Sequence, residues 1–169
     1  VEMSLRLLKL ERLDLWQLHR IDPQVPVEES LGEIAKLQKE GKIRHVGLSE
    51  VKPHEIEQAR KVVEIVSVQN KYNVGDRAHE DVVDYCTKEG LAFIPWFPVA
   101  AGKLAQTGGA LDAVAKRHGA TVGQLSLAWL LHRSPVILPI PGTSSMAHLE
   151  ENVAAGGVKL TDVEWVEIE

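Results

Sequence analysis

The segment 136–145 combines residue types that could hold an anion. Its apolar first half, 136–140, predicts a buried strand, and the residues after it predict a turn that opens a helix. Free backbone N–H groups and the helix dipole make such a helix start a binding site for phosphate. The small and hydroxyl residues at this turn are Gly142, Thr143, Ser144 and Ser145. The same pattern is also ordinary between a strand and a helix, where hydroxyl residues cap the helix.

Polar or aromatic side chains stand at the ends of the other predicted strands as well. Apolar runs at 13–18, 43–48, 66–69 and 91–95 predict these strands. The side chains at their carboxyl ends are His19, Ser49, Gln69 and Trp96. In a parallel barrel the chemistry collects at the carboxyl ends of the strands, so this coincidence predicts a site there.

The stretches between the strands have helical periodicity. They predict helices at 27–40, from residue 53 onward, and at 76–89, 111–118 and 125–132. Gly41 and Gly90 end two of these helices. Capping boxes at 121–124 and 161–164 begin the helix at 125 and a further helix near the end. Residues 1–10 predict the second part of a helix that precedes the first strand.

Strands that alternate with helices need right-handed crossovers and therefore a parallel sheet, either doubly wound or closed into a barrel. A doubly wound nucleotide-binding sheet should show a G-x-G-x-x-G turn after its first strand, and no such turn follows residue 18. We therefore predict an α/β fold of the parallel (β/α) barrel type. Residues 1–169 are short enough to form a single domain.

Composition narrows the classes of partner. The net charge is −5, and the basic side chains are interleaved with acidic ones, so nucleic acid and anionic membranes are poor partners. No apolar run is long enough to span a bilayer, and the single cysteine, Cys86, fits a reducing compartment. We expect a cytoplasmic protein. We expect no metal, because ligand spacing is absent among His45, His54, His79, His118 and His132.

Several segments resemble the aldo-keto reductases in order and spacing. They are LWQLHRID at 15–22, GKIRHVGLS at 41–49, QNKYN at 69–73 and VILPIPGTSS at 136–145. The likeness covers essentially the whole chain, yet it matches only the fourth to eighth strands of the family's eight-stranded barrel. The resemblance thus implies the C-terminal part of a (β/α)8 barrel, with about five of its eight βα units.

The resemblance assigns roles around the nicotinamide. His19 matches the catalytic histidine that helps orient the substrate carbonyl. Ser49 and Gln69 match the groups that bind the carboxamide, and Trp96 matches an aromatic ring that stacks on the nicotinamide. Glu50 is a departure, because many members have Asn there; its carboxylate can accept from the carboxamide nitrogen but cannot donate to the oxygen.

The resemblance also assigns the rest of a dinucleotide. Cofactor-binding residues of the loop around the pyrophosphate are Pro98, Val99, Gly102 and Leu104. Those of the adenosine-phosphate site are Gly142, Thr143, Ser144, Ser145 and His148, with Glu151 and Asn152 near the adenine. The implied cofactor is NADP(H), with NAD(H) less favoured, although many relatives carry Arg or Lys where this loop has hydroxyl residues.

The catalytic Asp, Tyr and Lys of the family lie on strands that precede the matched part. Tyr72 matches a loop position, and Tyr85 falls on the apolar side of a predicted helix, so neither is expected to replace the tyrosine. The resemblance implies an NADPH-dependent oxidoreductase that reduces aldehydes or ketones to alcohols, with this chain carrying the cofactor-binding side and a small-molecule carbonyl as substrate. Two alternatives stay open: a catalytically inactive dinucleotide-binding half-barrel, and an assembly fragment.

Geometry predicts how an independent chain of this kind would assemble. Five strands cut from a barrel leave unpaired edges at 13–18 and 136–140 and an uncovered inner face of apolar residues. A soluble monomer seldom exposes a contiguous apolar surface larger than about a few hundred Å². We therefore expect self-association or pairing with an N-terminal half.

Overall fold

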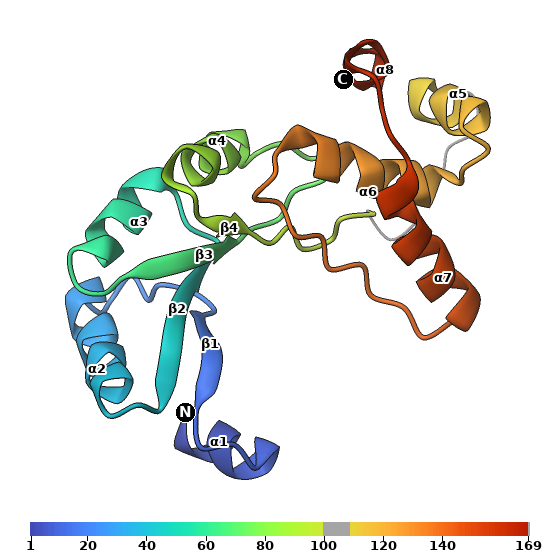
Figure 1. Cartoon of the computed structure of the whole chain (residues 1–169). Coiled ribbons are helices and arrows are strands. Elements are labelled where there is room, and N and C mark those ends of the chain that lie inside the picture. The colour runs from blue at the N-terminus through green and yellow to red at the C-terminus, as the bar shows by residue number, and fades with distance from the viewer. Residues whose placement is uncertain (100–108, 169) are drawn as a thin grey trace.

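The computed structural model describes residues 1–99 and 109–168, which contain a parallel sheet of four strands in the order β1-β2-β3-β4. The strands are β1 (Leu13–Leu18), β2 (Ile43–Ser49), β3 (Ile65–Gln69) and β4 (Ala92–Phe93). The helices are α1 (Glu2–Leu8), α2 (Val27–Lys39), α3 (Pro53–Arg60), α4 (Glu80–Glu89), α5 (Ala110–Arg117), α6 (Val122–Arg133), α7 (Met146–Ala154), the short 3-10 helix η2 (Ala155–Gly157) and α8 (Asp162–Ile168). The sheet is curved, with α2, α3 and α4 along its outer side (Figure 1). The predicted parallel α/β class is confirmed.

Local sequence signals set several helix ends. Gly90 ends α4 with a left-handed φ of 69°, a conformation that glycine adopts without steric cost. The capping box before α6 is present: the Gln124 N–H donates to Thr121 Oγ1 at 3.2 Å, and the Thr121 N–H donates to Gln124 Oε1 at 2.9 Å. Both helix boundaries were predicted by the residues that make them.

Alternation along the strands places a set of apolar side chains on one face of the sheet. Val46, Leu48, Val68 and Phe93 are fully buried and belong to one core cluster. Helical residues of the same cluster are Leu31 and Ile34 of α2, Ile56 and Ala59 of α3, and Val82, Val83 and Cys86 of α4. Since successive side chains of a strand point to opposite faces, the helices cover only one face of the sheet.

The other face carries a polar row across three strands. Gln17, Gly47 and Ser67 are register partners in β1, β2 and β3, and Gln17 Nε2 donates to Ser67 Oγ at 3.4 Å. The prediction of an apolar inner face is therefore wrong along this row. Two residues further along each strand, the same face leads to His19, Ser49 and Gln69.

The predicted fifth strand at 136–140 is not formed as a strand. Only Ile137 makes a parallel bridge, to Phe93, supported by the bonds Phe93 N–H to Val136 O at 2.9 Å and Leu138 N–H to Phe93 O at 2.8 Å. Proline lacks the N–H that a ladder needs, so Pro139 stops the pairing at once. The adjacent β4 is itself only two residues long, shorter than the predicted 91–95.

Helix α4 begins at Glu80 rather than at the predicted residue 76. Asn73 and Asp76 bond to each other through both backbone N–H groups, at 3.1 Å each, and this tight turn keeps residues 73–76 out of the helix. Asp76 also pairs with Lys71 at 2.6 Å. The loop after β3 is therefore ordered by its own contacts before the helix starts.

Strand β1 forms the edge of the sheet. Within the residues described, it pairs only with β2, and its second edge has no partner strand. Leu15 of this strand is 41% exposed, and Leu138 and Ile140 beyond the other end of the sheet are 60% and 43% exposed. No helix in the described ranges is long and apolar enough to cross a membrane.

Candidate functional site

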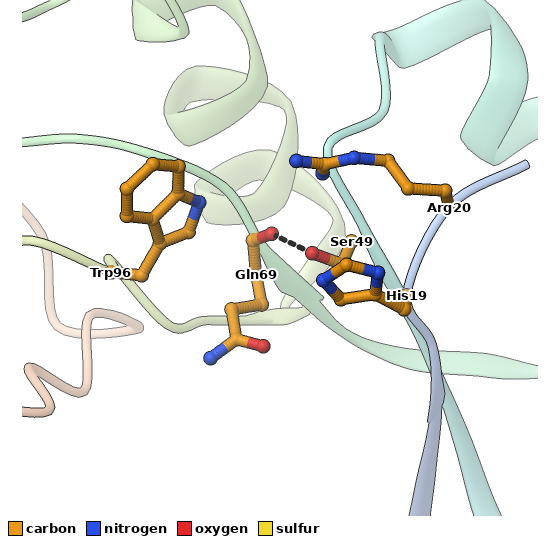
Figure 2. A pocket seen from close by; sticks show the side chains of 5 residues that line it. All are labelled: His19, Arg20, Ser49, Gln69 and Trp96. Carbon is orange, nitrogen blue, oxygen red and sulfur yellow. Dashed lines mark hydrogen bonds between the residues drawn. The ribbon is translucent and has the colours of Figure 1, made fainter.

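A pocket of about 340 Å³ opens at the carboxyl ends of the strands (Figure 2). Its lining residues are His19, Arg20, Ser49, Gln69 and Trp96. His19 follows β1, Ser49 and Gln69 are the last residues of β2 and β3, and Trp96 follows β4. The sequence predicted four of these residues, and the structure brings all four together. Arg20 was missed, although it directly follows His19.

Ser49 and Gln69 are joined at the floor of this pocket. Ser49 is 5% exposed, and its Oγ donates to the Gln69 backbone oxygen at 2.8 Å (Figure 2). The hydroxyl proton is thus engaged, while the oxygen lone pairs can accept from a ligand. The Gln69 side-chain amide carries both donors and an acceptor. Together they can bind a primary amide.

Glu50 takes part in the site in a way that the sequence did not predict. Its carboxylate accepts from the Trp96 indole Nε1 at 2.5 Å and from the Lys71 backbone N–H at 2.8 Å. The oxygen expected to accept from a carboxamide is therefore used within the protein. Glu50 has a left-handed φ of 56°, which no signal in its side-chain type would indicate.

His79 is the N-terminal cap residue of α4, yet its side chain is mostly buried. Asn70 Nδ2 faces His79 Nδ1 at 3.0 Å and also donates to the Val51 oxygen at 2.8 Å. Burial, with a smaller contribution from Lys52, lowers the pKa of His79. A neutral ring with an unprotonated Nδ1 accepts the Asn70 hydrogen bond, which joins Asn70 to the start of α4. The two bonds between Asn70 and the Val51 backbone join the loop after Gln69 to the segment after Ser49.

The predicted anion segment forms the start of α7. Gly142, Thr143 and Ser144 are exposed, and Ser145 caps the helix, its Oγ accepting from the His148 N–H at 3.5 Å. These residues do not line the Trp96 pocket. Glu151 is exposed on α7, whereas Asn152 lines a separate pocket of about 180 Å³.

Of the predicted pyrophosphate loop, Pro98 is buried and Val99 is half-buried. Gly102 and Leu104 lie outside the described residues. In the described part of the chain, no group of three or more His, Cys, Asp or Glu side chains could hold a metal ion.

Comparison with known proteins decides the family. The model of the aldo/keto reductase family matches residues 1–169. The chain belongs to the aldo/keto reductase family.

Curated relatives are similar to this chain over nearly all of its length. An uncharacterized oxidoreductase of Schizosaccharomyces pombe is 53% identical over 161 residues, which cover 95% of this chain and 53% of that protein. Pyridoxine 4-dehydrogenase of Escherichia coli is 44% identical over 168 residues, covering 96% of this chain and 58% of that protein. The chain spans little more than half the length of these relatives.

Solved structures of the family also match nearly the whole of this chain and only part of their own length. A thermostable aldo-keto reductase crystallised with the inhibitor epalrestat superposes with a TM-score of 0.93 at 33% identity, covering 99% of this chain and 62% of that one. An aldo/keto reductase from Klebsiella pneumoniae in complex with NADP and acetate has a TM-score of 0.88 at 30% identity, covering 99% and 61%. The fold is therefore that of about three fifths of an aldo/keto reductase barrel.

Neither tyrosine of this chain is among the residues that line the pocket. The buried Tyr72 hydroxyl donates to Glu80 Oε2 at 2.6 Å, and the Tyr85 hydroxyl accepts from Arg60 Nη1 at 3.1 Å. Both hydroxyls make contacts outside the pocket.

Proposed function

We propose that this chain is the cofactor-binding side of an NADPH-dependent reductase that converts small aldehydes or ketones to alcohols. The observation that supports this most is the convergence of His19, Ser49, Gln69 and Trp96 on one pocket at the strand ends. The donor set fits a nicotinamide: an amide-binding pair beside an indole face. NADPH, when bound, supplies the hydride.

The chain's own residues bind and orient the reactants. Ser49 accepts from the carboxamide nitrogen, and the Gln69 amide completes the pair, which fixes the ring face that meets the substrate. Trp96 stacks on the ring. His19 is exposed at the pocket and donates to the substrate carbonyl oxygen, which orients it as the reaction proceeds.

The start of α7 is proposed to hold the adenosine phosphate. Its Gly142–Ser145 segment, in which Gly142, Thr143 and Ser144 are exposed, offers backbone N–H groups and hydroxyls at the positive end of a helix dipole, with His148 in the first turn. Glu151 and Asn152 lie further along the helix toward the adenine. The Klebsiella neighbour was crystallised with NADP, which favours NADP(H) over NAD(H) for this chain.

Titration of the 169-residue chain with NADPH tests the cofactor proposal. We expect saturable quenching of tryptophan emission that is lost in Trp96→Leu and kept in Trp165→Leu, whose ring stacks on Trp129 away from the pocket. The affinity should be weak, because a site that encloses less of its ligand binds it less tightly. An absence of saturable quenching contradicts the proposal.

The second candidate function is a dinucleotide-binding half-barrel without turnover of its own. The engagement of Tyr72 and Tyr85 elsewhere favours it, since neither tyrosine of the given sequence reaches the pocket as a proton donor. Losing a general acid typically costs about 10²–10⁴-fold in rate. NADPH oxidation with a panel of aldehydes, quinones and pyridoxal, the last suggested by the name of the E. coli relative, distinguishes the two. Turnover by the isolated chain that disappears in His19→Ala contradicts the second candidate.

We further propose that the isolated chain pairs through its sheet edge, with a second copy or with a complementary N-terminal half. The unpaired edge of β1 and the exposed Leu15, Leu138 and Ile140 support this. Light scattering on a size-exclusion column measures it. A compact, cooperatively melting monomer at micromolar concentration contradicts the open-edge proposal.

A further inference from the structure

Glu50 contacts residues that follow three other strands. Its Oε1 accepts from the Lys71 backbone N–H at 2.8 Å and from Trp96 Nε1 at 2.5 Å. Its Oε2 lies 3.7 Å from Arg20 Nη1. These partners follow β3, β4 and β1, and Glu50 itself follows β2. One carboxylate therefore connects the carboxyl ends of all four strands of the sheet.

The backbone at this position is held in an unfavourable conformation. Glu50 has a φ of 56°, and Phe97, directly after Trp96, has a φ of 61°. Non-glycine residues stay in this region only where surrounding contacts determine it. The Glu50 N–H donates to the Gln69 oxygen at 3.1 Å, beside the bond from Ser49 Oγ to the same oxygen at 2.8 Å. The left-handed turn thus begins at the floor of the pocket.

The contacts constrain two of the lining side chains. A hydrogen bond from an indole N–H to a carboxylate is charge-assisted and stronger than a neutral one, so it fixes the rotation of the Trp96 ring. Arg20 is 53% exposed but faces the same carboxylate, and Figure 2 shows its side chain extending toward the Trp96 side of the pocket. Without Glu50, neither side chain keeps this partner.

We propose that Glu50 is a positioning residue of the pocket. It holds the Trp96 indole in the orientation that stacks on the nicotinamide and keeps Arg20 at the pocket mouth. It does not bind the carboxamide, because Oε1 already accepts two hydrogen bonds and Oε2 faces Arg20 and His79. The inference rests on the proposed function and adds to it a residue that acts through Trp96.

The test uses Glu50→Gly and Glu50→Gln, with Glu57→Gln on the exposed side of α3 as the matched control. Glycine adopts the left-handed φ freely, so this variant removes the carboxylate without adding backbone strain. Glutamine keeps the acceptor oxygen and the shape but loses the charge. Two readouts are taken: the indole N–H resonance of Trp96, identified by its loss in Trp96→Phe, and the Kd of NADPH measured from the emission of the nucleotide.

In Glu50→Gly we expect the Trp96 indole resonance to move upfield and the Kd of NADPH to rise about threefold to tenfold, the range of an aromatic stacking contact. Glu50→Gln should lie between this variant and the unsubstituted protein, and Glu57→Gln should match the latter. An unchanged resonance in Glu50→Gly overturns the proposal, and so does a moved resonance with an unaltered Kd. If the unsubstituted protein binds no NADPH, the proposed function itself fails, and the two failures are thereby distinguishable.

Discussion

Gly47 and Ser67 are register partners in β2 and β3, and a Cβ added to Gly47 would lie 2.3 Å from Ser67 Oγ. The same added Cβ would lie 3.0 Å from Gln17 Cγ of β1. The close approach of Gln17 and Ser67 in the polar row therefore requires a residue without a side chain at position 47.

Gly47→Ala should destabilise the protein by about 1–3 kcal/mol, because the added methyl overpacks the row and displaces Ser67 or Gln17. Urea unfolding measures this change. Gly32→Ala is the control: it lies in α2 with no atom within 4 Å of the added Cβ, so it should be neutral or stabilise by about 0.5–1 kcal/mol. Equal effects of the two substitutions would contradict the close approach.

Ser49→Ala should weaken NADPH binding and lower stability by about 1 kcal/mol, since the variant loses both the ligand contact and the bond to the Gln69 oxygen. Ser126→Ala is matched to it, because that buried hydroxyl donates to the Val122 oxygen at 2.8 Å in α6, outside the pocket. NADPH titration and urea unfolding of both variants separate the roles. If Ser126→Ala weakens NADPH binding as much as Ser49→Ala does, the assignment of Ser49 is wrong.

Tyr72→Phe should cost about 1.5–3 kcal/mol of stability, the range for a hydrogen bond to a charged group. In the unsubstituted protein the Tyr72 hydroxyl donates to one oxygen of Glu80, and Arg133 donates to the other oxygen of the same carboxylate. Tyr85→Phe removes a contact to the exposed Arg60 and should cost less than about 1 kcal/mol. Thermal or urea unfolding compares them, and a larger loss in Tyr85→Phe is the opposing result.

The lowered pKa of His79 predicts a pH dependence of stability. The unfolded ring takes up a proton below its ordinary pKa of 6.5, whereas the buried ring, facing Lys52, takes it up at lower pH. The unfolded state thus binds more protons in that interval, and stability falls as pH drops below 6.5 toward the lowered pKa.

Asp76 and Asp81 oppose this shift in the pKa of His79, and Glu50 Oε2 lies 3.8 Å from its Nε2. His79→Gln keeps an acceptor for Asn70 but cannot titrate. Urea midpoints measured from pH 8 to pH 5 should therefore fall more steeply in the unsubstituted protein than in this variant. Parallel curves would show that His79 does not titrate differently in the two states.

The fold was predictable from the sequence where a single residue determines the boundary of a helix or strand. Gly90 and Thr121 mark helix boundaries through their own conformation and hydrogen bonds, and the strand-end positions of His19, Ser49, Gln69 and Trp96 follow from periodicity and parallel topology. The predicted strand at 136–140 failed because its composition is apolar while Pro139 removes the hydrogen-bond donor that pairing needs. Apolar composition predicted neither pairing nor burial here, since Leu138 and Ile140 are exposed and only Ile137 is buried.

The contacts of Glu50 could not be predicted from the sequence. A glutamate gives no sign of a left-handed backbone, and its partners Arg20, Lys71 and Trp96 lie on separate loops that only the folded sheet brings together. The polar row of Gln17, Gly47 and Ser67 could not be predicted either, because it too depends on how the strands pair. Gln17 and Ser67 are 50 residues apart in the chain, and Gly47 is read as a feature of the site only once the strand register is known.

The order of the strands in the sheet determines when the residues that line the pocket can come together during translation. Each strand pairs with the one before it in the chain, so every new strand finds its partner already present when it leaves the ribosome. Among the residues that the structure describes, those lining the Trp96 pocket all lie within 19–96, and none of them belongs to the later helices. The residues proposed to bind the nicotinamide can therefore come together before translation reaches α7, where we propose that the adenosine phosphate binds.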